Sequence, residues 1–150
     1  MELLLLASED AWRLENVAPE VFDNPIDPAT TEAFLADPRH HIAVAIEEDL
    51  VVGFASGVHY VHPDKPPELF INEVATAPTH QRRGLAKAVL GLLLEQGRAL
   101  GCASAWVLTD SANAPAQALY ASLGGALMPG QIVGFEYDLQ TGRPSRARGG

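Results

Sequence analysis

One short stretch of this sequence combines charge, a glycine and small residues at the start of a helix-like run. It reads Gln81-Arg82-Arg83-Gly84-Leu85-Ala86 and follows an apolar, strand-like segment. The first turn of a helix leaves backbone N–H groups without intrahelical acceptors, and the helix dipole adds partial positive charge there. Gly84 lets an anion approach the backbone, and the two arginines attract it from a distance. The stretch therefore predicts an anion site, of the kind that cradles a pyrophosphate.

The same six residues lack the features of two better-defined anion motifs. They contain neither the Gly-Lys-Ser/Thr ending of a P-loop nor the spaced glycines of a dinucleotide fingerprint. A charged turn that happens to start a helix would contain the same residue types. What this stretch binds therefore depends on the elements around it.

Apolar periodicity and turn residues predict those elements. The first half contains a strand over 3–6, a helix over 8–22 capped by Ser8, a helix from Asp27-Pro28 to Asp37, a hairpin over 40–61 and a strand over 68–77. The second half contains a helix over 85–100 stopped by Gly101, a buried strand over 103–109, a helix over 113–123 capped by Asn113 and a final strand over 131–139. The order predicts an α+β fold. Its mixed central β-sheet has antiparallel N-terminal strands, a β-α-β-α-β second half and flanking helices.

The composition describes one globular domain. The chain has 150 residues, 47% of them hydrophobic and 19% charged, and no linker divides it. We expect a folded domain over 1–140 and a disordered polar tail over 141–150. No apolar run is long enough for a membrane span or a signal peptide, and Cys102 is the single cysteine. The cytoplasm is the expected compartment.

The net charge of −9 is unevenly distributed. Residues 1–73 hold 15 Asp and Glu against 3 Lys and Arg, whereas residues 74–150 hold 4 against 7. Such an acidic half argues against nucleic acid as a partner, because its phosphates require a basic face. It fits a cationic substrate attracted by a negative field, and equally an acidic surface that serves solubility.

A second motif, Asn113-Ala-Pro-Ala116-Gln-Ala-Leu119-Tyr120-Ala-Ser-Leu-Gly124, starts the predicted 113–123 helix. The pattern Gln/Arg-x-x-Gly-x-Gly/Ala after an apolar strand, followed by Asn-x-x-Ala-x-x-Leu-Tyr-x-x-x-Gly, resembles the GNAT superfamily of N-acetyltransferases. The element order over residues 1–140 resembles that fold as well. The resemblance implies that the anion at 81–86 is the pyrophosphate of acetyl-CoA.

A closer resemblance is to the type I aminoglycoside 3-N-acetyltransferases. It is carried by the segments 21–25, 51–60, 68–76, 80–101 and 110–125. This chain departs from those enzymes in one strand, where Asn72-Glu73 stands in place of Tyr-Asp. The carboxylate is chemically equivalent but longer, and the pocket wall at Asn72 is altered.

Transfer of an acetyl group to an amine requires a proton acceptor, since such amines are largely cationic at neutral pH. Glu73 lies in the strand that leads to the anion site, where it would accept the proton directly or through water. The alternative is a strand carboxylate in an ion pair or on a solvated face. By resemblance Tyr120 protonates the CoA thiolate, and the alternative is a core aromatic residue.

The resemblance also implies two sets of binding residues. The cofactor-binding set is Val74, Ala75, Gln81, Arg82, Arg83, Gly84, Leu85, Ala86, Asn113, Ala116 and Tyr120. Backbone groups at Val74 and Ala75 would pair with the pantetheine amides, and Asn113 would bond the same arm, cap its helix or do both. Asp23, Glu73 and Glu136 are the candidates for holding a cationic substrate. For Asp23 and Glu136 a solvated surface position is the alternative, and it is favoured more strongly for Asp27 and Asp138.

Other residues that often carry chemistry are assigned to structure. We expect no metal site, because His59 and His62 are three apart in a strand–loop region and point to opposite faces where extended. Cys102 is expected to be a packed thiol, and Trp12 and Trp106 are expected in the core.

The sequence thus predicts an acetyl-CoA-dependent N-acetyltransferase that works by direct attack of an amine on the thioester. The first substrate candidate is the 3-amino group of an aminoglycoside antibiotic, which would make the activity one of resistance. The alternatives are another amine (a polyamine, an amino-acid derivative or a protein N-terminus) and a non-catalytic acyl-CoA-sensing module. Neither nucleic acid nor a membrane is an expected partner. A homodimer is expected from the fold alone.

Overall fold

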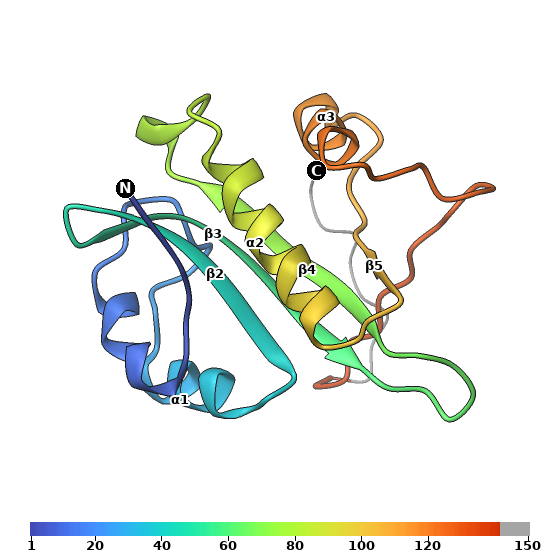
Figure 1. Ribbon diagram of the computed structural model, residues 1–150, viewed down its shortest axis with the longest axis horizontal. Helices are drawn as coiled ribbons and strands as arrows, with labels where there is room; N and C mark the ends of the chain where they lie inside the picture. Colours follow the sequence, from blue (N-terminus) through green and yellow to red (C-terminus); the bar gives the residue numbers. More distant parts are fainter. Residues whose placement is uncertain (142–150) are drawn as a thin grey trace.

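A mixed sheet in the order β1-β2-β3-β4-β5 forms the centre of the computed structural model, which describes residues 1–141 (Figure 1). The strands are β1 (Glu2–Leu5), β2 (His40–Glu47), β3 (Leu50–Tyr60), β4 (Glu68–Thr76) and β5 (Ser104–Trp106). The first four pair antiparallel, and β5 pairs parallel to β4. This arrangement confirms the predicted α+β fold class.

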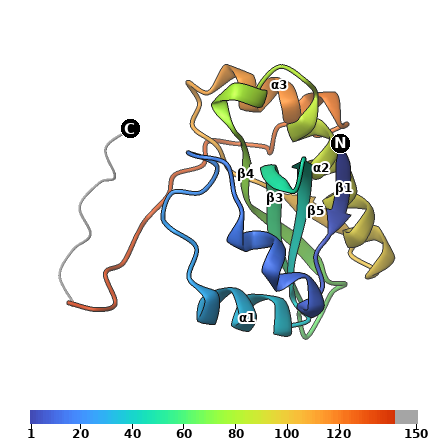
Figure 2. The same cartoon turned by 90° about the vertical axis from the view of Figure 1, so that its left-hand side faces the viewer.

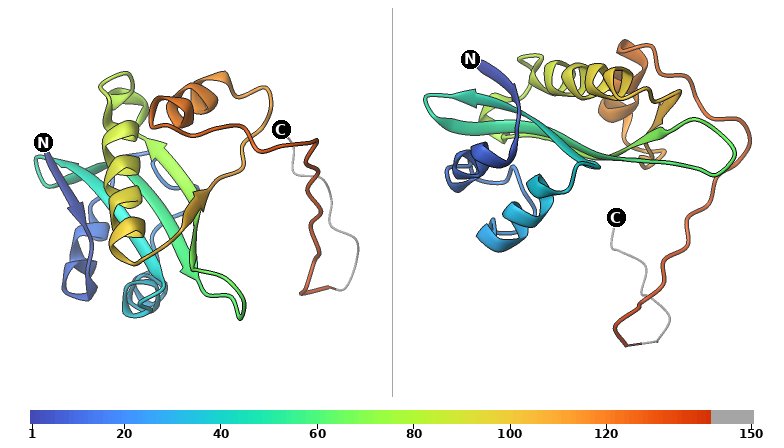
Figure 3. Two further views of the ribbon diagram at one scale, coloured as in Figure 1. Left: turned by 45° about the vertical axis from the view of Figure 1, so that its right-hand side comes forward. Right: turned by 60° about the horizontal axis from the view of Figure 1, so that its bottom comes forward.

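Helices cover both faces of the sheet. The long helix α2 (Leu85–Ala99) lies across one face, and the 3₁₀ helix η1 (Ser8–Glu15) lies with α1 (Pro28–Ala36) on the other (Figure 3, right). A short 3₁₀ helix, η2 (Pro78–His80), joins β4 to the loop before α2, and α3 (Ala114–Ser122) follows β5. The α1, α2 and α3 predictions are confirmed, including the start of α1 at Asp27-Pro28 and the Asn113 cap of α3.

Side-chain size differs between the two faces of β2 and β3. Gly57 belongs to the α2 face, because a Cβ there would lie 3.5 Å from Leu93. Ala43, Ala45 and Ala55 share that face by strand alternation, so α2 can pack closely against them. The opposite face carries larger side chains, among them Phe54, whose ring stacks on Phe22 at 4.1 Å.

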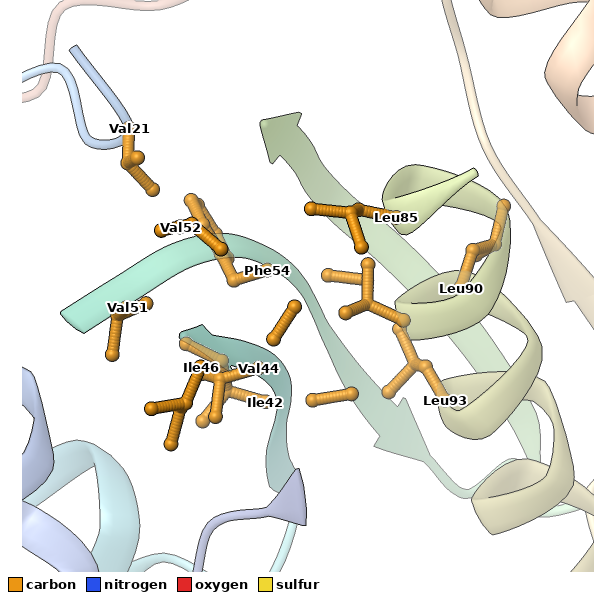
Figure 4. Close-up of a cluster of buried hydrophobic side chains, with 14 of the residues drawn as sticks. Val21, Ile42, Val44, Ile46, Val51, Val52, Phe54, Leu85, Leu90 and Leu93 are labelled. Atoms are coloured by element: carbon orange, nitrogen blue, oxygen red, sulfur yellow. The ribbon is translucent and has the colours of Figure 1, made fainter. Parts of the chain in front are cut away.

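The apolar core joins both layers (Figure 4). Val44, Val51, Phe54, Val89 and Leu93 are at most 1% exposed. Burial of each such side chain contributes about 1.5–3 kcal/mol of hydrophobic stabilisation. The core therefore fixes α2 on the strands that precede it, and with α2 the position of the loop at its N-terminus.

The first helix differs from its prediction. It is a 3₁₀ helix that ends at Glu15, and its N-cap residue is Ala7 rather than Ser8. Backbone bonds to β3 explain the early end: the Val51 N–H donates to the Asn16 carbonyl at 2.9 Å and the Ala18 N–H to the Val51 carbonyl at 2.8 Å. Trp12, expected in the core, is 55% exposed and lies under the Arg13 guanidinium.

The C-terminal strand predictions are also wrong in part. β5 covers only Ser104–Trp106, with Ser104 and Ala105 exposed rather than buried. Residues 131–139 form no strand of the sheet and run away from it (Figure 2). A three-residue edge strand offers few ladder bonds, and the Pro129-Gly130 turn, with a φ of 82° at Gly130, redirects the chain. Of the predicted tail over 141–150, residues 142–150 lie outside the described residues.

Candidate active site

A bulge in β4 decides where Glu73 points. Gly57 lies opposite Ile71 and Ser56 lies opposite Glu73, so Asn72 is an extra residue in β4. In regular alternation Glu73 would share the face of Ile71, beneath α2. Because directly opposed residues project to the same face, the bulge moves Glu73 to the face of Ser56, beside η1 and α1.

Glu73 lines a pocket of about 290 Å³ on that face. The apolar walls come from the N-terminal loop, α1 and the strands, namely Leu14, Phe22, Pro25, Ile26, Phe34, Ile42 and Phe54. The polar lining is Asp27, Thr30, Thr31, Ser56, Asn72 and Glu73. The Glu73 side chain is exposed and makes no ion pair or hydrogen bond within residues 1–141. A larger cavity of about 450 Å³, between η1 and α1, adjoins this pocket but does not reach β4.

The other acidic candidates have different surroundings. The Asp27 carboxylate accepts hydrogen bonds from the Thr30 N–H at 2.8 Å and the Thr30 hydroxyl at 2.6 Å, and these bonds lower its pKa. Asp27 is therefore a helix cap at the pocket wall. Asp23 is exposed, next to the lining residue Phe22. Glu136 lies on the detached C-terminal segment, outside this pocket, because the predicted final strand does not join the sheet.

β4 and β5 stop pairing beyond Phe70. Pairing of the two strands stops at Phe70 and Trp106, whereas β4 continues to Thr76 along β3 (Figure 1). Val74 and Ala75 lie in this unpaired stretch, opposite Ala55 and Phe54 of β3. One edge of the β4 backbone is thus outside the described ladder and available to the amides of an extended ligand.

The loop that begins α2 has the geometry of an anion site. Residues 81–84 are exposed, and Gly84, the N-cap of α2, has a φ of 77° with open space where a Cβ would stand. Arg82 also has a positive φ, 61°. Backbone turned in this way presents successive N–H groups to one side, next to the positive end of a 15-residue helix.

The two arginines of this loop differ in their partners. The Arg83 guanidinium donates to both carboxylate oxygens of Glu47, at 2.7 and 3.3 Å. With His80, it holds the pKa of Glu47 at about 2, well below the usual range. Arg82 makes no ion pair with any described residue. Arg82 is therefore the arginine whose side chain is available to an anion.

The second motif forms α3 and the turn after it. The side-chain oxygen Oδ1 of Asn113 accepts a hydrogen bond from the Ala116 N–H at 3.1 Å, which caps the helix. Asn113 is thus a cap in this structure, and its amide NH₂ group remains exposed to a ligand. Gly124, with a φ of 88°, follows the helix end, as the sequence predicts.

Tyr120 lines a cavity of about 150 Å³ between α2, α3 and the diverging strands. Its neighbours there are mostly apolar and include Ile71, Leu90 and Leu123. Burial raises the pKa of Tyr120 above the usual value of a phenol, so the group stays protonated at neutral pH. The side chain is half-buried and packs against the core, so a structural role and a ligand-facing role are both compatible with its position.

The structure brings the predicted residues to two sides of β4. Ile71 contributes to the cavity of Tyr120, and Asn72 and Glu73 contribute to the opposite pocket. Sequence reasoning missed Glu47 and His80, which contact the α2 loop from distant positions. The Arg82-Arg83 pair, next to an acidic half of the chain, was the one signal for such a partner.

Two expected absences concern metals and membranes. No group of three His, Cys, Asp or Glu side chains within residues 1–141 is arranged to hold a metal ion. In the same part of the chain, no helix combines the length and apolar character that crossing a bilayer requires.

Comparison with known proteins identifies relatives of this chain. Residues 8–125 match the model of the acetyltransferase (GNAT) family. The N-alpha-acetyltransferase RimI of Mycobacterium tuberculosis is 32% identical over 121 residues, which cover 79% of this chain and 74% of the relative. The L-2,4-diaminobutyric acid acetyltransferase of Virgibacillus pantothenticus is 35% identical over 94 residues, covering 63% of this chain and 58% of the relative.

Solved structures share the fold at lower sequence identity. An aminoglycoside acetyltransferase from an uncultured soil metagenomic sample, in complex with sisomicin, superposes with a TM-score of 0.77 at 20% identity. The superposition covers 93% of this chain and 96% of that one. At such identity the likeness concerns the fold.

Proposed function

The chain belongs to the acetyltransferase (GNAT) family, and from this premise we propose that the Glu73 pocket holds the acceptor amine of the reaction. As a member of this family it is an acetyl-CoA-dependent N-acetyltransferase. The proposal is carried by one observation: the bulge directs an unpaired carboxylate into a pocket, while Tyr120 lies across β4 from it.

Acetyl-CoA supplies an activated acyl group on a thioester. The exposed loop at 81–86 fits its pyrophosphate, because positive φ values at Arg82 and Gly84 turn backbone N–H groups outward at a helix N-terminus. Gly84 leaves room where a side chain would stand. The unpaired edge of β4 at Val74 and Ala75 then receives the amides of the pantetheine arm.

Glu73 prepares the acceptor. A primary amine that enters the pocket as a cation loses a proton to the Glu73 carboxylate, directly or through water, and its lone pair then attacks the thioester carbonyl carbon. The carbon–sulfur bond breaks as the carbon–nitrogen bond forms. Tyr120, which burial keeps protonated, donates its proton to the departing thiolate. The nitrogen then releases its second proton to water, and Tyr120 regains a proton from water.

The first substrate candidate is a cationic small molecule, and within that class the 3-amino group of an aminoglycoside. The acidic N-terminal half supports a substrate with several amino groups, such as an aminoglycoside. The exposed Asp23 beside the pocket wall supports it as well. The resemblance of 68–76, 80–101 and 110–125 to the 3-N-acetylating enzymes supports the regiochemistry. Resistance to the antibiotic would be the consequence.

A protein N-terminus is the second candidate. The RimI relative, which is named as an N-alpha-acetyltransferase, is a specific observation in its favour. The pocket supports it as well, since Phe22, Phe34 and Phe54 would pack on an apolar first side chain better than on a polyhydroxylated sugar.

One assay separates the candidates. Release of the CoA thiol is measured with purified protein, acetyl-CoA and a panel of aminoglycosides, diamines and peptides. Turnover of an aminoglycoside but not of its 3-N-acetylated form is the expected result. Activity confined to peptides would establish the second candidate instead, and tight CoA binding without any turnover would indicate an acyl-CoA sensor.

We further propose that the protein works in the cytoplasm as a homodimer. Large apolar side chains in 131–139 support an association surface, since Val133, Phe135, Tyr137 and Leu139 are 74–93% exposed. Sedimentation of the full chain and of Phe135→Ser tests this: the variant should shift toward monomer, and a wild-type monomer at high concentration would contradict the proposal.

A further inference from the structure

Glu47, the last residue of β2, lies under the loop that begins α2. It follows Ala43 and Ala45 on the face that α2 covers. Besides Arg83, its carboxylate binds the ring of His80, with 2.7 Å between Oε2 and Nε2. The other ring nitrogen of His80 lies 2.8 Å from the Thr79 hydroxyl. One carboxylate therefore holds the chain on both sides of Arg82.

The turn that follows Glu47 has contacts of its own. Glu48 and Asp49, with φ values of 50° and 63°, form a two-residue hairpin turn whose twist matches the flanking strands. The Asp49 carbonyl also accepts a hydrogen bond from the Asn16 side chain at 2.8 Å. Glu47 thus connects the α2 loop to a fixed corner of the sheet, 36 residues earlier in the chain than Arg83.

The backbone conformation of Arg82 requires restraint from its surroundings. A positive φ is unfavourable for a residue with a Cβ, and it persists only where the surroundings impose it. Its side chain is exposed and makes no ion pair with a described residue, so it cannot fix the backbone. The contacts of Glu47 with His80 and Arg83 are side-chain interactions that restrain the residues on both sides of it.

We infer that Glu47 is a positioning residue for the acyl donor: through His80 and Arg83 it holds the 81–84 backbone in the conformation that receives a pyrophosphate. The inference rests on the proposed function, which places acetyl-CoA on this loop. It assigns Arg83 a structural task through its side chain and leaves the direct electrostatic contact to Arg82.

Charge alone predicts the opposite effect of Glu47, namely weaker binding of the acyl donor. A carboxylate near a helix N-terminus neutralises Arg83 and competes with an incoming anion. If masking dominated, removal of the charge would tighten CoA binding. If positioning dominates, removal loosens it, because the loop must then be ordered upon binding. The sign of the change decides between the two.

The test is the Kd for CoA by titration calorimetry, in wild type, Glu47→Gln and the matched control Glu48→Gln from the same turn. We expect Glu47→Gln to raise this Kd about tenfold. Glu48→Gln should leave it unchanged, since its side chain is exposed. The Glu47→Gln enzyme should show a raised KM for acetyl-CoA and an unchanged kcat at saturation. Acetyl-pantetheine, which lacks the pyrophosphate, should react equally well with wild type and variant.

Arg83→Lys provides a second variant that keeps the charge but loses the two-point contact with Glu47. It should raise the Kd for CoA in the same direction. An unchanged or lowered Kd in Glu47→Gln would overturn the inference while leaving the CoA site in place. Gly84→Val tests the proposed CoA site itself. If that variant binds CoA like wild type, the pyrophosphate does not lie on this loop. The proposed CoA site and the positioning role of Glu47 are then both wrong.

Discussion

Glu47 and Glu73 are both strand glutamates, yet their surroundings are opposite. The Glu47 carboxylate has three close contacts, two from the Arg83 guanidinium and one from the His80 ring, and they hold its pKa at about 2. Glu73 has none within residues 1–141 and faces a pocket. A carboxylate whose two oxygens both accept hydrogen bonds orders its neighbours, whereas one without partners can exchange a proton. The difference supports the two proposed roles, a positioning one for Glu47 and a chemical one for Glu73.

The strongest test of this contrast is Glu73→Gln. The amide keeps the shape of the side chain but cannot accept the proton of an ammonium group, so kcat should fall about 10²–10³-fold. The Kd for CoA should stay within twofold of wild type. Steady-state kinetics and calorimetry measure the two quantities, and unchanged turnover would remove Glu73 from the reaction.

Tyr120→Phe tests the protonated group on the other side of β4. We expect kcat to fall about 10–100-fold, because the thiolate loses its proton donor. A phenol is protonated below its pKa, and burial raises that pKa, so wild-type kcat should not decline through this group up to about pH 10. A pH–rate profile and a melting curve are the measurements. A variant that melts earlier with normal kcat would assign Tyr120 to the core.

Gly84→Val and Arg82→Ala compare the contributions of the backbone and of the arginine side chain to CoA binding at the loop that begins α2. Valine is strained at a φ of 77° and places methyl groups where the anion approaches, so the Kd for CoA should rise at least about tenfold. Arg82→Ala removes one exposed charge and should raise it only about two- to threefold. The reverse order in calorimetry would make the arginine the main binding element.

The smallest effect is expected for Asn113→Ala. Loss of the cap on α3 should cost about 1 kcal/mol of unfolding free energy. If Asn113 is only a cap, KM for acetyl-CoA should remain unchanged while the chemical denaturation midpoint falls. A rise in KM without loss of stability would show that the exposed amide contacts the donor.

Most of the fold could be predicted from local patterns. The hairpin at 40–60, the Asp27 and Asn113 caps and the long helix after Gly84 depend on residues close in sequence, whose periodicity and turn chemistry are readable. The two wrong predictions depend on contacts with residues that are distant in the sequence. The helix from Ser8 stops early because β3 takes its backbone bonds, and the strand at 131–139 does not form because its partner edge is three residues long.

The sequence by itself determined the family resemblance, the anion loop at 81–86 and the identity of Glu73 and Tyr120 as candidates. Only the tertiary structure decided which way Glu73 faces, because a one-residue bulge inverts strand alternation without leaving a mark in composition. It also decided that Arg83 is occupied and Arg82 is not, because the partner Glu47 lies 36 residues away in the chain. Contacts between distant segments form only when the sheet brings them together, so no local pattern can reveal them.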